Sequence, residues 1–326
     1  MTMTISKTLM GAASALVLGL AAPAFAEIKV ALDSPASMDS GTYVWAHTFT
    51  EYLNANGMEA VEYERGALGG EAEKLDQVSQ GLLEVSMSDV KSAGTLDGTI
   101  FGVFLPYFFE DYHQIDKAMT KGGMLERINA GTTPKGVRVA NVVYLGDAAG
   151  IFTTNKSVKS MADMEGLRMR ALDEAQIEIF KAWGAQGTIV SWAEVPNALQ
   201  TGVADGYLNP SFVPLLFGHT GFIKHFTDAQ IVPSSRAAVM SEDWYQGLSD
   251  AERDTVNAAI EAANTANREW LKNQASVLDK LEEAGVEVIK LDDAKRGEFR
   301  EASQAIWGNI PMPDGALDAW KAAIKD

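Results

Sequence analysis

The stretch DMEGLRMRALDEAQIEIFKAWGAQGTIVSWAEVPNALQTGVADGYLNP, from Asp163 to Pro210, gives the strongest indication of the fold. A short strand ends on Arg170, a helix follows, an apolar strand leads to Trp192, and a second helix leads to the turn at Asn209. Side chains at the ends of neighbouring strands converge in α/β folds, so these three residues are expected to meet in one crevice. The stretch holds no obvious nucleophile or metal ligand, which favours a protein that binds a molecule over one that transforms it.

The rest of the chain continues the alternation of strand-like and helix-like patterns. Strands are expected at residues 28–32, 58–63, 82–87, 137–145, 205–208, 236–240 and 286–290. Helices are expected at residues 38–56, 71–80, 112–129, 210–217, 250–284, 293–309 and 315–324. This order predicts an α/β fold with mostly parallel sheets covered by helices.

The length of the chain suits two lobes, each with a full core. Lobe I is expected to hold residues 27–147 and a returning segment of about 235–275, and lobe II residues 148–234 and a C-terminal segment of about 276–326. A helix over about 250–284 would be roughly 50 Å long, enough to lie across both lobes. A Gly-x-x-acid step occurs at Gly81–Glu84 and again at Gly202–Asp205. The repeat could reflect two related lobes, or it could reflect two ordinary helices that each end on a glycine.

The first 26 residues read as a secretory signal peptide. Lys7 precedes an uncharged, largely apolar run that ends in Ala24-Phe25-Ala26, so cleavage is expected after Ala26. A retained membrane anchor is the alternative. The chain has no cysteine, so neither a lipidated cysteine nor a disulfide is possible. These features together predict a soluble periplasmic protein.

Composition and motifs exclude several classes of function. The formal net charge of −17 disfavours nucleic acid and anionic lipid surfaces as partners. The sequence has no G-x-S-x-G, Walker A, G-x-G-x-x-G or H-E-x-x-H motif, and no pair of carboxylates is singled out for catalysis. The histidines lack the spacing of metal ligands, namely His47, His113, His219 and His225. A monomeric, non-enzymatic protein without cofactor or metal is therefore expected.

Each residue of the predicted crevice has a structural alternative to ligand binding. Arg170 is placed to clamp a carboxylate or sulfonate, but it could instead form a salt bridge with Asp173 or Glu174. Trp192 could wall a ligand cavity or pack in the core. Asn209 could hydrogen-bond a ligand or form an Asx-turn.

Around these residues the chain closely resembles the substrate-binding proteins of tripartite ATP-independent periplasmic (TRAP) transporters, the family that includes binders of dicarboxylates, sialic acid and ectoine. The pattern that carries the resemblance is Gly166-Leu167-Arg168-Met169-Arg170, Trp192-Ala193-Glu194-Val195 with Ala198-Leu199-Gln200, and Ala204-Asp205-Gly206-Tyr207-Leu208-Asn209-Pro210. Further matches are Leu68-Gly69-Gly70-Glu71, Leu105-Pro106-Tyr107, Thr154-Asn155-Lys156 and Met161-Ala162-Asp163-Met164.

The resemblance implies a two-lobed periplasmic binding protein fold with a long helix spanning both lobes. It implies a cleft that closes on a small organic anion or zwitterion, which is then delivered to a membrane permease. On this pattern Arg170 would pair with the ligand carboxylate, Trp192 would be the cleft aromatic and Asn209 the cleft asparagine. A ligand-presenting sensor subunit and a secreted hydrolase are the alternative functions.

The departures from the family pattern bear on the ligand. Gly150 stands where many members carry a second arginine. Acidic contacts are expected at three places, Asp33, Asp89 and Asp173, and a further wall residue at Phe212. An acidic rim facing one arginine suits a zwitterion, as in the ectoine-binding branch. Arg236 could instead supply a second positive charge and favour a simple carboxylate or sulfonate, and the sequence leaves both readings open.

Overall fold

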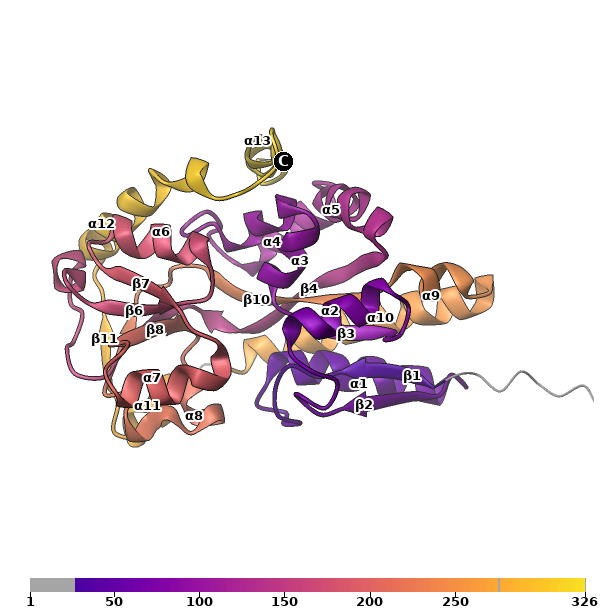
Figure 1. Cartoon of the computed structure of the whole chain (residues 1–326), viewed down its shortest axis with the longest axis horizontal. Helices are drawn as coiled ribbons and strands as arrows, with labels where there is room; N and C mark the ends of the chain where they lie inside the picture. The colour runs from indigo at the N-terminus through magenta and orange to yellow at the C-terminus, as the bar shows by residue number, and fades with distance from the viewer. Residues whose placement is uncertain (1–26, 275, 326) are drawn as a thin grey trace, which may run out of the picture.

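The chain folds into two lobes, each built on its own sheet (Figure 1). The computed structural model describes residues 27–274 and 276–325, so the predicted signal peptide and its cleavage site lie outside the described residues. The first sheet has the strand order β2-β1-β3-β10-β4, and the second has the order β11-β9-β5-β8-β6-β7. The predicted α/β class with two lobes is confirmed.

The first lobe surrounds the first sheet with helices on both faces. Its strands are β1 Ile28–Ala31, β2 Ala60–Tyr63, β3 Val85–Ser88, β4 Val137–Ala148 and β10 Pro233–Ser241. Its helical segments are α1 Gly41–Ala55, α2 Glu71–Ser79, α3 Val90–Leu96, η1 Gly98–Phe104, α4 Tyr112–Met119, α5 Met124–Thr132, η2 Thr133–Lys135 and α9 Glu242–Gly247. Alternate residues of β10 enter the two cores, because successive strand side chains point to opposite faces.

The second lobe is built in the same way on the second sheet. Its strands are β5 Gly150–Thr153, β6 Arg168–Ala171, β7 Gln186–Ile189, β8 Gly206–Asn209, β9 His225–Asp228 and β11 Glu287–Lys290. Its helical segments are η3 Met161–Met164, α6 Glu174–Ala182, η4 Trp192–Glu194, α7 Val195–Gln200, α8 Val213–Phe217, η5 His219–Gly221, α11 Val277–Glu283 and α12 Asp293–Gln304. β6 runs parallel to β7 and β8, and β5 is antiparallel to β8 and β9.

Two extended segments connect the lobes side by side. One is the passage from β4 to β5, and the other is the passage from β9 to β10. They are tied together where the Ala149 N–H donates to the Val232 carbonyl at 2.8 Å and the Ile231 N–H donates to the Ala149 carbonyl at 2.9 Å. We propose this paired crossing as the hinge and as the boundary between the lobes.

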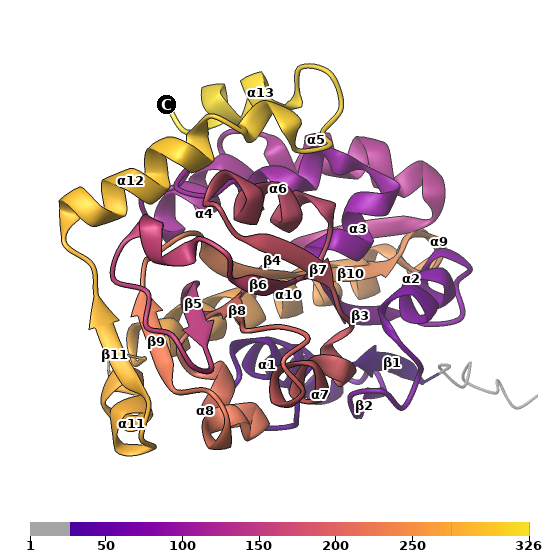
Figure 2. The same ribbon diagram turned by 60° about the vertical axis from the view of Figure 1, so that its left-hand side comes forward.

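The long helix expected over residues 250–284 is divided in two. α10 spans Asp250–Lys272, and α11 follows at Val277–Glu283. Between them, the N–H groups of Asn273 and Gln274 donate to the carbonyls of Trp270 and Leu271, three residues back, so the α-helical ladder ends there. The helix was predicted to span both lobes, and α10 and α11 together do so, because α10 packs in the first lobe and α11 in the second (Figures 1 and 2).

Two other expectations on the helices are wrong. The single helix predicted at residues 112–129 is broken between α4 and α5, where Gly123 adopts a φ of 68°. The C-terminal segment after α12 and the short helix η6 (Trp307–Asn309) leaves lobe II (Figure 2). Its last helix, α13 (Ala316–Ala323), instead buries Trp320 in the core of the first lobe, with the indole N–H donating to the Thr99 carbonyl at 2.7 Å.

The repeated Gly-x-x-acid step marks the same local structure in each lobe. Both glycines have a positive φ, 72° and 74°, and each follows a helix. In the first lobe the carboxylate that ends the step accepts the N–H of Lys29 on β1 at 2.9 Å. In the second lobe the corresponding carboxylate accepts the N–H of Arg168 on β6 at 2.9 Å. The two lobes therefore share one plan, in which the acid before one strand fixes the start of its parallel neighbour.

Candidate functional site

Arg170 is the buried cation on the lobe II side of the site. It lies near the end of β6 and is 6% exposed, whereas Arg168 on the same strand is exposed and paired with Asp205. Arg170 Nε donates to the Val190 carbonyl at 2.9 Å, which fixes the plane of the guanidinium. Its two terminal nitrogens make no hydrogen bond with any described residue. Burial and the neighbouring Arg236 lower the pKa of Arg170 to about 10.

Arg170 does not form the internal salt bridge with Asp173 or Glu174 that was the alternative to ligand binding. No carboxylate of the described residues lies within 4.0 Å of its guanidinium nitrogens. Asp173 instead caps α6, because its Oδ1 accepts the N–H of Gln176 at 2.9 Å. Burial raises the pKa of the Asp173 carboxyl. Arg170 is thus a buried cation held in place without an anion of its own.

An aromatic group stands beside this cation. The guanidinium carbon of Arg170 lies 5.7 Å from the ring centroid of the half-buried Trp192. Trp192 also contacts the rings of Tyr207, Phe217 and His219, with centroids 5.8, 5.2 and 5.2 Å away. Trp192 therefore packs against other rings of the lobe and also covers the arginine, and its role as the wall of a ligand cavity stays a prediction.

The ring cluster behind Trp192 is uncharged. The Tyr207 hydroxyl and His219 Nδ1 are 3.2 Å apart, and both side chains are buried. Burial lowers the pKa of His219 to about 4 and raises the pKa of the Tyr207 hydroxyl, so both are neutral at pH 7. The residues that back Trp192 therefore add no charge to that of Arg170.

Three further residues at the strand ends shape the lobe II side. Asn209 ends β8, is half-buried, and its side-chain amide makes no hydrogen bond within the described chain. Phe212 is 5% exposed and meets Trp270 of α10 edge-on, with centroids 6.5 Å apart. Gly150 leaves no room for an arginine, because a Cβ there would lie 2.3 Å from the Phe226 ring. The contact of Asn209 or Phe212 with a ligand stays a prediction.

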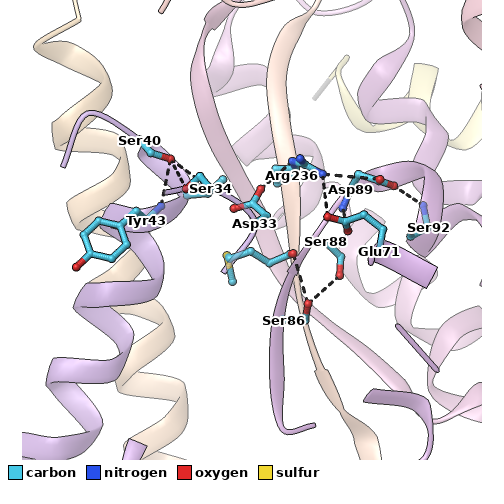
Figure 3. Close-up of polar contacts among 12 residues, drawn as sticks. Asp33, Ser34, Ser40, Tyr43, Glu71, Ser86, Ser88, Asp89, Ser92 and Arg236 are labelled. Atoms are coloured by element: carbon cyan, nitrogen blue, oxygen red, sulfur yellow. Dashed lines mark hydrogen bonds and ion pairs between the residues drawn. The ribbon is translucent and has the colours of Figure 1, made fainter. Parts of the chain in front are cut away.

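The lobe I side carries a half-buried arginine, and here the charge is paired. Arg236 of β10 places Nε 2.9 Å from Oδ2 of Asp33. Its Nη1 is 3.8 Å from both Glu71 Oε1 and Asp89 Oδ2. Figure 3 shows Arg236 between Asp33 on one side and Glu71 with Asp89 on the other. Burial acts to lower the pKa of Arg236, but the three carboxylates outweigh it and raise that pKa.

Asp33 is the least satisfied of these carboxylates. Its side chain is 4% exposed, and neither oxygen receives a well-aligned hydrogen bond despite the close approach of Arg236. Glu71, by contrast, accepts the N–H of Asp89 at 3.2 Å and pairs with the buried Lys74 at 3.5 Å. A buried carboxylate without an aligned hydrogen bond is costly, and the contact of Asp33 with a ligand stays a prediction.

Two contacts join the lobes beside this site. Lys91 Nζ, on α3 of lobe I, donates to the carbonyl of Leu172 at 3.1 Å, just past β6 of lobe II. The guanidinium carbon of Arg65, after β2 of lobe I, lies 5.8 Å from the ring centroid of Phe217 in lobe II. These contacts hold the wall that carries Arg170 against the wall that carries Arg236.

The sequence predictions missed some members of the site. Lys91 and the pairing role of Glu71 were not foreseen, nor was the contact of Tyr207 with Trp192. A repeat in the sequence does mark the site: Ala-Leu-Asp begins on the last residue of β1 in lobe I and of β6 in lobe II, at residues 31–33 and 171–173. Among the described residues, no group of three or more His, Asp or Glu side chains is arranged to hold a metal ion.

The comparisons with known proteins identify the family. Residues 37–311 match the profile of the bacterial extracellular solute-binding proteins, family 7. The chain belongs to this family. The recognition of a TRAP substrate-binding protein from the sequence is thereby confirmed at the level of the family, which consists of solute-binding proteins.

Individual solute-binding proteins of this family are similar over nearly the whole chain. The C4-dicarboxylate-binding periplasmic protein DctP of Rhodobacter capsulatus is 27% identical over 99% of this chain and 100% of its own. The ectoine-binding periplasmic protein TeaA of Halomonas elongata is 25% identical over 86% of each chain. The solved ectoine-binding protein of the Halomonas elongata TeaABC TRAP transporter has a TM-score of 0.84 at 23% identity, covering 92% of this chain and 99% of its own.

Proposed function

We propose that this solute-binding protein captures a small organic carboxylate in the cleft between its lobes and delivers it to a TRAP membrane permease. The observation that carries the proposal is Arg170: a buried, positioned guanidinium whose terminal nitrogens have no acceptor among the described residues. A carboxylate accepts two parallel hydrogen bonds from such a group. The names of the relatives, which bind dicarboxylates, sialic acid and ectoine, support the same chemistry.

The charges around the cleft favour a ligand with one carboxylate and a donor at its other end. Arg236 offers no second free positive charge, since Asp33, Glu71 and Asp89 already surround it. Asp33, Glu71 and Asp89 outnumber the two cations that pair with them, Arg236 and the buried Lys74, while Lys91 donates to the Leu172 carbonyl of the other lobe. A second carboxylate would be repelled there, whereas an ammonium, an amidinium or a hydroxyl could donate to Asp33. The acidic-rim reading is thus preferred over the reading with two free arginines.

We further propose that the protein is periplasmic, is released from its leader after Ala26, acts as a monomer, does not bind nucleic acid and does not turn its ligand over. Family membership supports an extracellular solute-binding role. Within residues 27–274 and 276–325, no helix is both long and apolar enough to cross a membrane. Gel filtration, mass spectrometry of the mature N-terminus and analysis of recovered ligand after incubation test these points.

Isothermal titration calorimetry of Arg170→Ala tests the cleft assignment. A thermal-shift panel of zwitterions, hydroxycarboxylates, dicarboxylates and sulfonates first identifies the ligand of the wild-type protein. Removing the clamp should then weaken its binding by about 2–5 kcal/mol, because a buried charged pair is broken. Arg168→Ala is the matched control, since Arg168 lies on the same strand but is exposed and paired with Asp205. Equal affinity of wild type and Arg170→Ala would overturn the proposal.

A further inference from the structure

A cavity of about 690 Å³ lies away from the cleft, against the hinge. Ala148 and Pro233, at the ends of the two crossing strands β4 and β10, form part of its wall. The rest comes from the loop after η1 in lobe I and from the C-terminal segment, which runs from α12 on lobe II to α13 on lobe I (Figure 2). Its volume is in the range of ordinary small-molecule sites.

The lining of this hinge cavity combines flat aromatic surface with positive charge. Tyr107, Phe108 and Trp307 supply aromatic rings, and Phe108 meets Trp307 edge-on at 5.2 Å between centroids. Four cationic side chains stand against two carboxylates in the lining, namely Arg296, Arg300, Lys321 and Lys325 against Glu110 and Asp111. This local excess of positive charge is notable in a chain with a net charge of −17.

Part of the positive charge in the lining lacks a hydrogen-bond or ion-pair partner among the described residues. Arg296 Nε is buried and has no hydrogen-bond partner, although its terminal nitrogens contact Leu291 O and Asp293 at 3.2 and 3.4 Å. Arg300 and Lys321 make no ion pair with any residue that the structure describes. The Arg300 guanidinium carbon lies 5.8 Å from the Tyr107 ring centroid. Arg300 is exposed and Arg296 is half-buried, so a dissolved anion can reach their guanidinium groups.

The backbone of the hinge cavity is strained. Tyr107 and Gln230 have φ of 56° and 50°, and they are the only non-glycine residues with positive φ in the described chain. Both line the cavity. Tyr107 also ties lobe I to the crossing strands, because its N–H donates to Ile231 O at 2.7 Å and its hydroxyl donates to Ala229 O at 3.1 Å. Such strain is found where surrounding structure enforces it, often at functional sites.

We propose that the hinge cavity is a second binding site, which takes an aromatic carboxylate or sulfonate and biases the angle between the lobes. The ring of such a ligand would pack between Tyr107 and Trp307, and its anionic group would lie on Arg296 and Arg300. Because the walls come from both lobes and both crossing strands, a change in the angle between the lobes changes the cavity. A ligand that prefers one angle therefore shifts the population of open and closed forms.

Calorimetric titration with 2-naphthoate tests the site, using the mature chain without cleft ligand. We expect saturable one-to-one binding. The double variant Arg296→Gln/Arg300→Gln should weaken this binding by about tenfold or more, because hydrogen bonds to charged groups are lost. Arg127→Gln, an exposed arginine on α5, should leave it unchanged, as should the cleft variant Arg170→Ala. 2-Naphthylmethylamine, with the same ring and the opposite charge, should bind at least tenfold more weakly, and this comparison needs no variant.

Coupling to the hinge is read out separately by spin labels on the two lobes. The chain has no native cysteine, so Leu82→Cys in lobe I and Val203→Cys in lobe II, at side chains 57% and 52% exposed, give specific attachment points. Addition of 2-naphthoate to the labelled Arg170→Ala protein should shift the distance distribution between the labels. An unchanged distribution would overturn the coupling. Three results would each overturn the proposed site. They are a lack of saturable 2-naphthoate binding, equal binding of the amine, and loss of binding in Arg170→Ala but not in the double variant.

Discussion

The two walls of the proposed cleft each carry an arginine, and the surroundings of the two arginines are opposite. Arg236, on the lobe I wall, is about a quarter exposed and lies within 4 Å of Asp33, Glu71 and Asp89. Arg170, on the lobe II wall, is 6% exposed, and its guanidinium contacts a backbone carbonyl and a tryptophan ring but no carboxylate of the described residues. A buried charge is stable when it is paired, so we propose that Arg236 stabilises the fold and that Arg170 is available for a ligand anion.

Replacing the paired arginine should give the largest effect on stability. Arg236→Met would leave three carboxylates facing one another, and we expect a loss of about 3–5 kcal/mol in the free energy of unfolding. Urea unfolding followed by circular dichroism measures this change. The control is Arg138→Met, which removes an arginine of the same sheet that has one carboxylate partner, Glu242. A loss no larger than that of the control would show that Arg236 is not the centre of this wall.

Lowering the pH should decrease the free energy of unfolding through His219, which lies behind Trp192 on the lobe II wall. Its pKa is about 4 in the folded protein and 6.5 when unperturbed, so between these values the unfolded chain binds more protons. The stability that the neutral ring provides is therefore complete above pH 6.5 and is lost as the pH falls toward 4, by up to about 1.4 kcal/mol per pH unit. His219→Gln should flatten the pH dependence of unfolding in this window, and His113→Gln, at an exposed position, should not.

Replacing Asp33 tests the difference between the two walls through ligand affinity. Asp33→Asn keeps the shape of the side chain but removes the charge, so a zwitterionic ligand should bind about tenfold more weakly. A dicarboxylate should bind no worse, since repulsion falls. Calorimetry with both ligand types measures the difference. Glu71→Gln is the control, because Glu71 is 3.8 Å from Arg236 and already accepts a backbone N–H. Equal losses in the two variants would contradict the direct role of Asp33.

Removing the unpaired arginine should have the smallest effect on the empty protein. Arg170→Met takes away a desolvated charge and keeps most of the side-chain volume, so unfolding free energy should stay within about 1 kcal/mol of wild type, or rise. The measurement is urea unfolding without ligand. A loss as large as that of Arg236→Met would mean that Arg170 is held by the fold itself, and the contrast between the walls would fail.

The strand ends of lobe II could be predicted from local sequence. Arg170, Trp192 and Asn209 each follow a short apolar or alternating run, and the structure places them at the ends of β6, β7 and β8. The pairing of Arg236 could not be predicted in this way. Its partners come from three separate segments of the chain, after β1, at the start of α2 and after β3, which meet only once the sheet is assembled.

Local sequence patterns were enough to predict the α/β class and the two lobes, because strand and helix periodicity and the glycine and asparagine turns act over a few residues. The role of Arg170 as the anion clamp was implied by the family resemblance and stays a prediction. The packed fold was needed to show which arginine lacks a carboxylate partner among the described residues, where the long helix breaks, and that α13 returns to the first lobe. Those outcomes depend on burial and on distances between residues far apart in the chain. Which charged side chains pair in the interior depends on the packed fold and cannot be inferred from local sequence patterns.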